Sequence, residues 1–224
     1  CKDSINRKLR IYNESGKATL QNVSVLKDSV VKVIIKGDSL KDFQSYVVQR
    51  KQGNLKYQKV EKINFLDTPS NSFIIYDTVK TNKQLLCYKV VTNRACNPPQ
   101  ASDTFCAIQL SGNGQNLANR LSWQAFEGYP LDSQYILIKS GNAYDTLARI
   151  SGNDTTYTHS PLRCNVPETY KVLGYEQDGT RTTLSDTAIL TPIDTVPPPM
   201  VNIRNTTVIN SDSIRITWDT VNDV

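Results

Sequence analysis

Short apolar or alternating segments follow one another along the chain, separated by Gly, Asn, Asp and Pro. This spacing is typical of an all-β sandwich, and no stretch of helical periodicity competes with it. In the first half the pattern predicts strands near 18–25, 30–36, 44–51, 57–63, 72–77, 85–93 and 104–111. In the second half it predicts strands near 107–112, 119–124, 133–140, 145–150, 154–159, 168–176 and 185–190.

The sequence around the two tryptophans repeats. Arg-Leu-Ser-Trp at 120–123 returns as Arg-Ile-Thr-Trp at 215–218, 95 residues later. An upstream copy aligns Ile35 with Trp123, Tyr46 with Tyr135, and Tyr88 with Tyr170. A period near 90 residues is too long for solenoid units, which repeat every ~20 to 50 residues. The repeat therefore indicates tandem β-domains.

The repeat divides the chain into four parts. Residues 1–16 would end a preceding β domain or form an N-terminal linker, and 17–110 and 111–193 would each be a complete domain. Residues 194–224 would be a Pro-rich linker and the first strands of a third domain, because 191–200 contains four of the ten prolines and such a segment is extended and stiff. Cys1 fits a fragment boundary, and a lipidated N-terminus stays an open alternative.

Composition limits the classes of partner that the chain is expected to bind. The net charge of +5 is spread along the chain without a basic and aromatic cluster, which argues against nucleic-acid binding. No apolar run approaches the ~18 residues that span a bilayer. We expect an exported protein that contacts neighbouring domains of the same polypeptide.

The cysteine count also favours an oxidising compartment, with five cysteines and no CxxC spacing. Cys87 and Cys106 fall on adjacent antiparallel strands, and a turn near Cys96 would place them opposite each other. We predict that these two form a disulfide with α-carbons ~4.4 to 6.8 Å apart. Cys1 and Cys164 are expected to be unpaired within the chain.

Catalytic motifs are absent from the sequence. His159 is the only histidine, and it is interpreted as a surface residue. There is no phosphate-binding loop, no GxSxG motif and no DxDxDG calcium loop. We therefore expect no enzyme activity, no cofactor and no metal site.

Three features together resemble fibronectin type III domains. They are Trp on the second strand, Tyr-x-Val on the sixth strand, and a closing Ser-Asp-Thr strand. The resemblance implies tandem seven-stranded immunoglobulin-like sandwiches. The phrase Leu-Ser-Trp at 121–123 followed by Glu-Gly-Tyr-Pro at 127–130 resembles repeats of large secreted Bacteroidota proteins, of the gliding-motility-associated or type IX secretion kind. It implies an exported bacterial protein, extracellular or at the cell surface.

Thirteen of the sixteen aspartates are followed by Ser or Thr. Ten of these pairs continue with Ile, Val, Leu, Ala or Thr, a pattern that resembles the O-glycosylation acceptor of Bacteroidota. The alternative is turn and strand-edge chemistry, in which the side-chain oxygens bond local backbone. The candidate acceptors are Ser4, Ser29, Ser39, Thr78, Thr146, Thr155, Thr187, Thr195, Ser213 and Thr220.

These observations favour a non-catalytic structural spacer or scaffold segment of a secreted or cell-surface multidomain protein. A surface adhesin, or a module that binds polysaccharide or protein through exposed loops and tyrosines, is the first alternative. Accessory domains of a larger extracellular hydrolase are the second.

Overall fold

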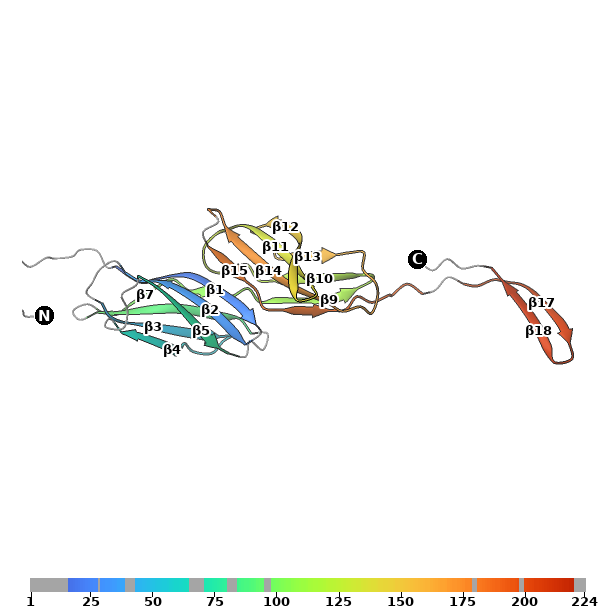
Figure 1. The fold of residues 1–224 in the computed structure, drawn as a ribbon, viewed down its shortest axis with the longest axis horizontal. Helices are drawn as coiled ribbons and strands as arrows, with labels where there is room; N and C mark the ends of the chain where they lie inside the picture. The colour runs from blue at the N-terminus through green and yellow to red at the C-terminus, as the bar shows by residue number, and fades with distance from the viewer. Residues whose placement is uncertain are drawn as a thin grey trace, which may run out of the picture.

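The computed structural model describes residues 16–27, 29–38, 43–64, 71–79, 84–94, 98–178, 181–197 and 200–219. Two β-sandwiches follow each other along the chain, and a separate hairpin lies beyond them (Figure 1). The described residues contain strands and no helix. The all-β tandem architecture predicted from the sequence is present. Ser4 and the rest of the expected strand at 4–13 lie outside the described residues.

The first sandwich has two antiparallel sheets. One sheet has the order β1 (Thr19–Lys27), β2 (Val30–Lys36), β5 (Ser72–Thr78). The facing sheet has the order β4 (Gln58–Asn64), β3 (Phe43–Gln52), β6 (Leu86–Arg94), with β7 (Gln100–Ala101) and β8 (Phe105–Cys106) both paired to β6. Because alternate residues of a strand face opposite sides, Val31, Val33 and Ile35 of β2 enter the core while Lys32, Ile34 and Lys36 face outward.

The second sandwich repeats this arrangement. One sheet has the order β9 (Leu110–Gln115), β10 (Ala118–Trp123), β13 (Thr156–His159). The other has the order β12 (Ala143–Ser151), β11 (Leu131–Ser140), β14 (Glu168–Glu176), with β15 (Thr182–Leu184) and β16 (Ala188–Leu190) both paired to β14. Gly53 and Gly141 have φ of +53° and +60° in the equivalent hairpins β3–β4 and β11–β12. This left-handed conformation suits glycine and explains the Gly-Asn pair in each turn.

The last strand of each sandwich is divided at its Ser-Asp pair. The Ser102 hydroxyl accepts a bond from Val90 N (2.9 Å) and donates to Asp103 O (2.7 Å). The Ser185 hydroxyl accepts from Val172 N (2.8 Å) and donates to Asp186 O (2.7 Å). The side chain thus replaces a backbone acceptor where the strand bends away from the ladder. This is the structural role of the repeated Ser-Asp-Thr motif.

This division corrects the strand boundaries expected from the sequence. A continuous strand at 104–111 is not formed, since 107–109 connect β8 of the first sandwich to β9 of the second. The last strand of the second sandwich begins at Thr182 in β15, earlier than the expected start at Ser185. Both stretches mix apolar and small polar residues, and this pattern does not reveal where one ladder stops and the next begins.

The strand registers also correct the repeat alignment. Tyr46 pairs with Thr92, and the equivalent pair in the second sandwich is Gln134 with Gly174. Tyr46 therefore corresponds to Gln134, and the expected match with Tyr135 is wrong by one residue. Tyr135 lies on the other face of its strand.

The hairpin β17 (Ile203–Asn210) and β18 (Ser213–Trp218) stands apart from both sandwiches. All its residues are exposed, including Ile216 and Trp218. Among the described residues of the linker before it, those at its start bond the second sandwich: Ile193 pairs with Asn116, and Thr195 N donates to Asn116 Oδ1 (2.9 Å).

Candidate functional site: the junction between the sandwiches

A disulfide joins Cys87 of β6 to Cys106 of β8 at the end of the first sandwich. The two residues are directly opposite in the strand register, and their α-carbons are 3.9 Å apart, closer than expected from the sequence. The pair is the one predicted from the spacing of the strands. Cys164 is free and half-buried, while Cys1 and Cys96 lie outside the described residues.

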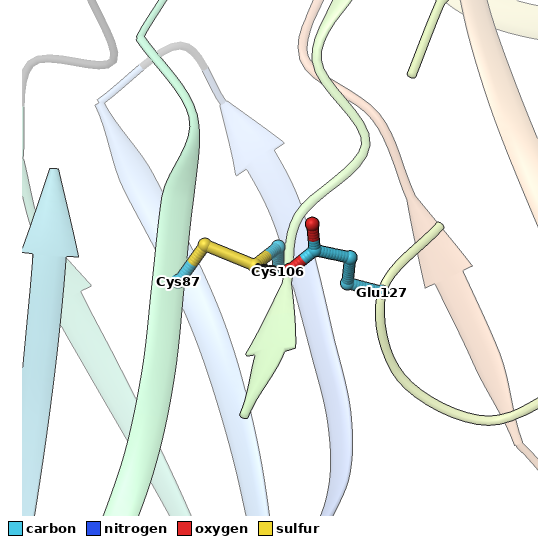
Figure 2. Close-up of side chains that lie close together, drawn as sticks. All are labelled: Cys87, Cys106 and Glu127. Atoms are coloured by element: carbon cyan, nitrogen blue, oxygen red, sulfur yellow. Dashed lines mark hydrogen bonds between the residues drawn. A yellow bond between two sulfur atoms is a disulfide. The ribbon is translucent and has the colours of Figure 1, made fainter. Parts of the chain in front are cut away.

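Glu127, from the loop between β10 and β11, reaches this disulfide (Figure 2). Its Oε2 lies 3.1 Å from Cys106 Sγ, and its carbonyl accepts a bond from Cys106 N (2.8 Å). The ligand atoms of Cys87, Cys106 and Glu127 lie within 4.8 Å of one another, the one such cluster among the described residues. Metal binding by cysteine requires a thiolate, and both sulfurs are already bonded to each other. The contact therefore positions a loop of the second sandwich against the first.

The rest of this loop forms an aromatic cluster with the first sandwich. Phe105, Phe126 and Tyr129 meet edge to face, with centroids 5.0 to 6.4 Å apart. Tyr129 is 4% exposed and packs into the core cluster of the first sandwich although it belongs to the second. A Cβ on Gly128 would meet the Phe126 ring at 2.5 Å, so a larger residue there would displace this ring. The Glu-Gly-Tyr-Pro phrase is thus a docking loop.

Arg181 covers the outer side of this cluster. Its guanidinium lies 4.3 Å from the Tyr129 ring centroid, and its Nε and Nη2 donate to the Glu176 carboxylate. The bond with Glu176 raises the pKa of Arg181, and burial raises that of Tyr129, so the cation and the neutral phenol persist together. Such a stacked, paired arginine is a rigid element of the junction.

Strands β1 and β15 also bond across the junction. Thr183 Oγ1 donates to Val23 O (2.8 Å), Leu184 N donates to Ser24 Oγ (3.2 Å), and Asn22 Nδ2 donates to Thr182 O. These are side-chain to backbone bonds between residues about 160 positions apart in sequence. They fix the outer face of β1 against the second sandwich.

Lys171 completes the junction. The side chain is 5% exposed, and its ammonium donates to the carbonyl oxygens of Val25 (3.3 Å) and Leu26 (3.1 Å). A buried ammonium is costly unless it is hydrogen-bonded, so this contact is specific. Sequence reasoning missed it, because Lys171 lies in an alternating strand where a lysine reads as a surface residue.

Each sandwich core contains a buried tyrosine on its sixth strand whose hydroxyl bonds side chains. Tyr88 donates to Asp77 Oδ2 (2.8 Å), and Arg50 Nη1 donates to both Asp77 oxygens. Burial and the Asp77 carboxylate raise the pKa of Tyr88, opposed by Arg50. These groups hold the neutral phenol inside the core.

In the second sandwich the equivalent tyrosine is Tyr170. Its hydroxyl lies 2.9 Å from His159 Nδ1 and accepts a bond from Asn119 Nδ2 (3.1 Å). His159 is half-buried, which corrects the interpretation as a simple surface histidine. Desolvation lowers the pKa of His159, although the Glu168 charge opposes this shift. Trp123 and Tyr170, 7% and 0% exposed, belong to one core cluster.

The candidate glycosylation residues are distributed over the surface. Those that are exposed are Ser29, Thr78, Thr146, Thr195 and Ser213. Thr155 and Thr187 are half-buried, and Ser4, Ser39 and Thr220 lie outside the described residues.

Several of the preceding aspartates have a structural partner of their own. They accept backbone or side-chain bonds as follows: Asp77 from Arg50, Asp154 from Ser151 N, Asp186 from Leu110 N and Asp194 from Val196 N. The Asp-Ser/Thr bias is explained at these four places by local and tertiary hydrogen bonding. No described segment forms a helix capable of crossing a bilayer.

Comparisons with known proteins yield solved structures only. No family model matches the chain, and neither does any curated protein. The chain is similar to the FN1–FN3 domains of chicken CNTN1, at 13% identity and a TM-score of 0.32, covering 93% of this chain and 77% of that one. It is also similar to a two-domain fibronectin type III segment of chicken tenascin, at 14% identity and a TM-score of 0.33, covering 77% and 97%. The fold assignment rests on the strand orders themselves: both sandwiches have a fibronectin type III-like fold, in tandem.

Proposed function

We propose that this chain is a non-catalytic spacer and scaffold segment of a secreted or cell-surface multidomain protein. The observation that carries the proposal is the junction between the sandwiches. Tyr129 inserts into the first core cluster, and buried Lys171 bonds two carbonyls of the first sandwich. A linker that only tethered two domains would need neither contact, so the junction fixes their spacing and orientation.

The second linker complements this fixed unit. After Thr195 no residue of the described linker bonds either sandwich, and its prolines favour an extended chain. An extended linker after a docked pair holds whatever follows it away from the pair. We place the domain boundaries of this scaffold at 17–110 and 111–193.

An exported bacterial origin is part of the proposal. A disulfide suits an oxidising compartment, and the docking loop has the Glu-Gly-Tyr-Pro phrase that resembles repeats of secreted Bacteroidota proteins. Several acceptor-like residues are exposed, and Thr195 lies at the linker, where a glycosyltransferase can reach the backbone. Protein from its native host should carry hexose-type mass there, whereas cytoplasmic heterologous protein should have the bare mass of 25.1 kDa. Native material of the bare mass would remove the glycoprotein part.

The scaffold itself is tested by ¹⁵N relaxation of the full chain. Amides of the two sandwiches should report one common rotational correlation time, and those of β17 and β18 a shorter one. Lys171→Met removes the donor that bonds the Val25 and Leu26 carbonyls, and it should give the two sandwiches different correlation times. Lys139→Met, at an exposed lysine of the same sheet, is the matched control. Independent tumbling of the two sandwiches in the unmodified chain would contradict a fixed spacer.

A further inference from the structure

A cleft of about 610 Å³ lies where the outer face of the β1–β2–β5 sheet meets the start of β15. Binding pockets for small ligands often form at domain interfaces and have ~300 to 1,000 Å³, a range that includes this cleft. The first sandwich contributes a floor made mostly of amide, hydroxyl and ammonium groups: Gln21, Asn22, Ile34, Lys36, Asn71 and Ser72. The cleft exists only because the two sandwiches are docked.

The second sandwich contributes a wall whose main group is held in place. Arg181 is fixed by Glu176 and by the Tyr129 ring, and the guanidinium N–H groups that do not bond Glu176 remain available to a ligand. Thr182 stands beside it with its hydroxyl. A preorganised donor of this kind loses little conformational entropy when a ligand binds.

Several polar groups of the cleft have no partner within the described part of the chain. They are the Lys36 ammonium, the Asn71 amide and the Thr182 hydroxyl. These groups offer both donors and acceptors on neutral side chains, together with one ammonium. The Arg181 charge is balanced by Glu176, and Asp178 lies close enough to act on it. The cleft is therefore polar with little net charge, which suits a neutral ligand rich in hydroxyls.

An apolar strip leads out of the cleft along β5. Ile74 and Tyr76 are 53% and 61% exposed and face the same side as Ser72, because alternate residues of a strand share a face. The registers place Ile34 beside Ile74 and Lys32 beside Tyr76. The four-residue step from Ser72 to Tyr76 spans ~13 Å. A long ligand could thus contact polar groups at one end and an aromatic ring at the other.

We propose that this groove binds a neutral oligosaccharide. Sugar rings combine hydroxyl edges with apolar C–H faces, so amides and hydroxyls of the cleft would bond the edges while the Tyr76 ring packs on a face. The site extends the spacer role to recognition of a glycan chain. It depends on the junction because its floor belongs to the first sandwich and its wall to the second.

The test is an NMR titration of the ¹⁵N-labelled full chain. The probes are cellohexaose, laminarihexaose, xylohexaose, mannohexaose and chitohexaose, with hexagalacturonate as the charged comparison. At least one neutral probe should give saturable shifts at the amides of Lys36, Ser72, Tyr76 and Thr182. Absence of saturable shifts with all the neutral probes, binding of hexagalacturonate alone, or shifts confined to other surfaces would overturn the proposal.

Two variants and a control locate the site. Tyr76→Ala and Asn71→Ala should each weaken binding of that probe by about fivefold or more, as expected for loss of a ring contact or a neutral hydrogen bond. Trp218→Ala removes an aromatic side chain of similar exposure, 60%, from β18 and should leave the affinity unchanged. Equal loss in all three variants would show that binding does not depend on the groove. The proposed spacer role would survive that result, since its test is the common tumbling of the sandwiches.

Discussion

The two sandwiches share one topology but close their cores differently. Ile35 pairs with Leu20 in the first, and at the equivalent position of the second Trp123 pairs with Leu110. The neighbouring position compensates, with Tyr46 in the first sandwich and Gln134 in the second. At this pair of neighbouring positions each core thus has one large aromatic ring, but on different strands.

The hydrogen-bonding groups around these positions also differ between the two sandwiches. Trp123 Nε1 donates to Gln134 Oε1 (2.9 Å), and Gln134 Nε2 in turn donates to the carbonyl oxygens of Gly152 and Asp154. In the first sandwich the Tyr46 hydroxyl instead accepts a bond from Asp38 N (2.9 Å). The Trp123 indole, the Gln134 amide and the Tyr46 hydroxyl each have a partner, so two different side-chain sets fit one backbone architecture.

The equivalent tyrosines Tyr88 of β6 and Tyr170 of β14 have different polar partners. Arg50, beside Tyr88 on β3, balances Asp77 in the first sandwich, and Ile138 occupies the place of Arg50 in the second. There the partner comes from β10, as Asn119, where the first sandwich has Val31. The comparison indicates that the tyrosine is the fixed element, and that its partners vary provided that its hydroxyl is bonded.

Replacing the core aromatic should have the largest effect. Trp123→Ala should destabilise the second sandwich by ~3 to 5 kcal/mol, because it removes a buried ring and also leaves Gln134 without its donor. Ile35→Ala, at the equivalent position, should cost the first sandwich less, since no hydrogen bond is lost there. Amide hydrogen exchange measured separately for each sandwich distinguishes the two costs. An equal or larger cost for Ile35→Ala would break the comparison.

Removing the disulfide should lower the unfolding free energy of the first sandwich by an amount comparable to the Trp123→Ala effect, and it should leave the second sandwich unchanged. At the equivalent positions the second has Thr169 opposite Ile189, which are not cross-linked. Cys87 and Cys106 are 19 residues apart, so the double serine variant should lose about 3 kcal/mol through the entropy of the unfolded chain. Urea unfolding followed by sandwich-specific resonances checks this. A loss of equal size in the second sandwich would show instead that the Glu127 contact transmits the change.

The tyrosine hydroxyls should rank next. Tyr88→Phe removes a bond to a charged carboxylate and should cost about 1.5 to 3 kcal/mol, whereas Tyr170→Phe removes bonds between neutral groups and should cost about 0.5 to 1.5 kcal/mol. The same hydrogen-exchange measurement applies to both variants. If Tyr170→Phe proves the more costly, the partners of the hydroxyl do not set its contribution.

The sequence predicted most of the fold for a physical reason. Alternating apolar residues, Gly-Asn turns and a closing Ser-Asp-Thr are local signals, and each one marks a local structure. The cysteine pair could likewise be placed, because adjacent strands joined by a short turn bring Cys87 opposite Cys106. The alignment of Tyr46 with Tyr135 failed because both residues are tyrosine, and matching them implies a one-residue shift that the strands do not have: Tyr46 follows Ile35 by 11 residues, as Gln134 follows Trp123.

The junction could not be predicted in the same way. Lys171 looks like any outward residue of an alternating strand, and only a neighbouring domain makes it buried. Glu127, Gly128 and Tyr129 were visible as a phrase, but their role depends on contacts with Phe105 and Cys106 of the preceding sandwich. Contacts between domains follow no sequence period, so a single sequence contains no signal for them.

The smallest expected effect is a pH dependence of stability that only the second sandwich should show. Because Asn119 donates to the Tyr170 oxygen, the Tyr170 proton is free to bond His159 Nδ1, which must then be neutral. The pKa of His159 is lowered in the fold, so the unfolded chain binds more protons between that pKa and the usual ~6.5. The second sandwich should therefore lose stability as the pH falls from about 7 through the folded pKa and then level off. The loss should be small, since His159 is only half-buried and its charge is partly solvated.

His159→Gln should abolish this pH dependence while the first sandwich, which has no histidine, shows none in either protein. Sandwich-specific hydrogen exchange between pH 5 and 7.5 checks this, and a slope retained in His159→Gln would assign the titration to another group.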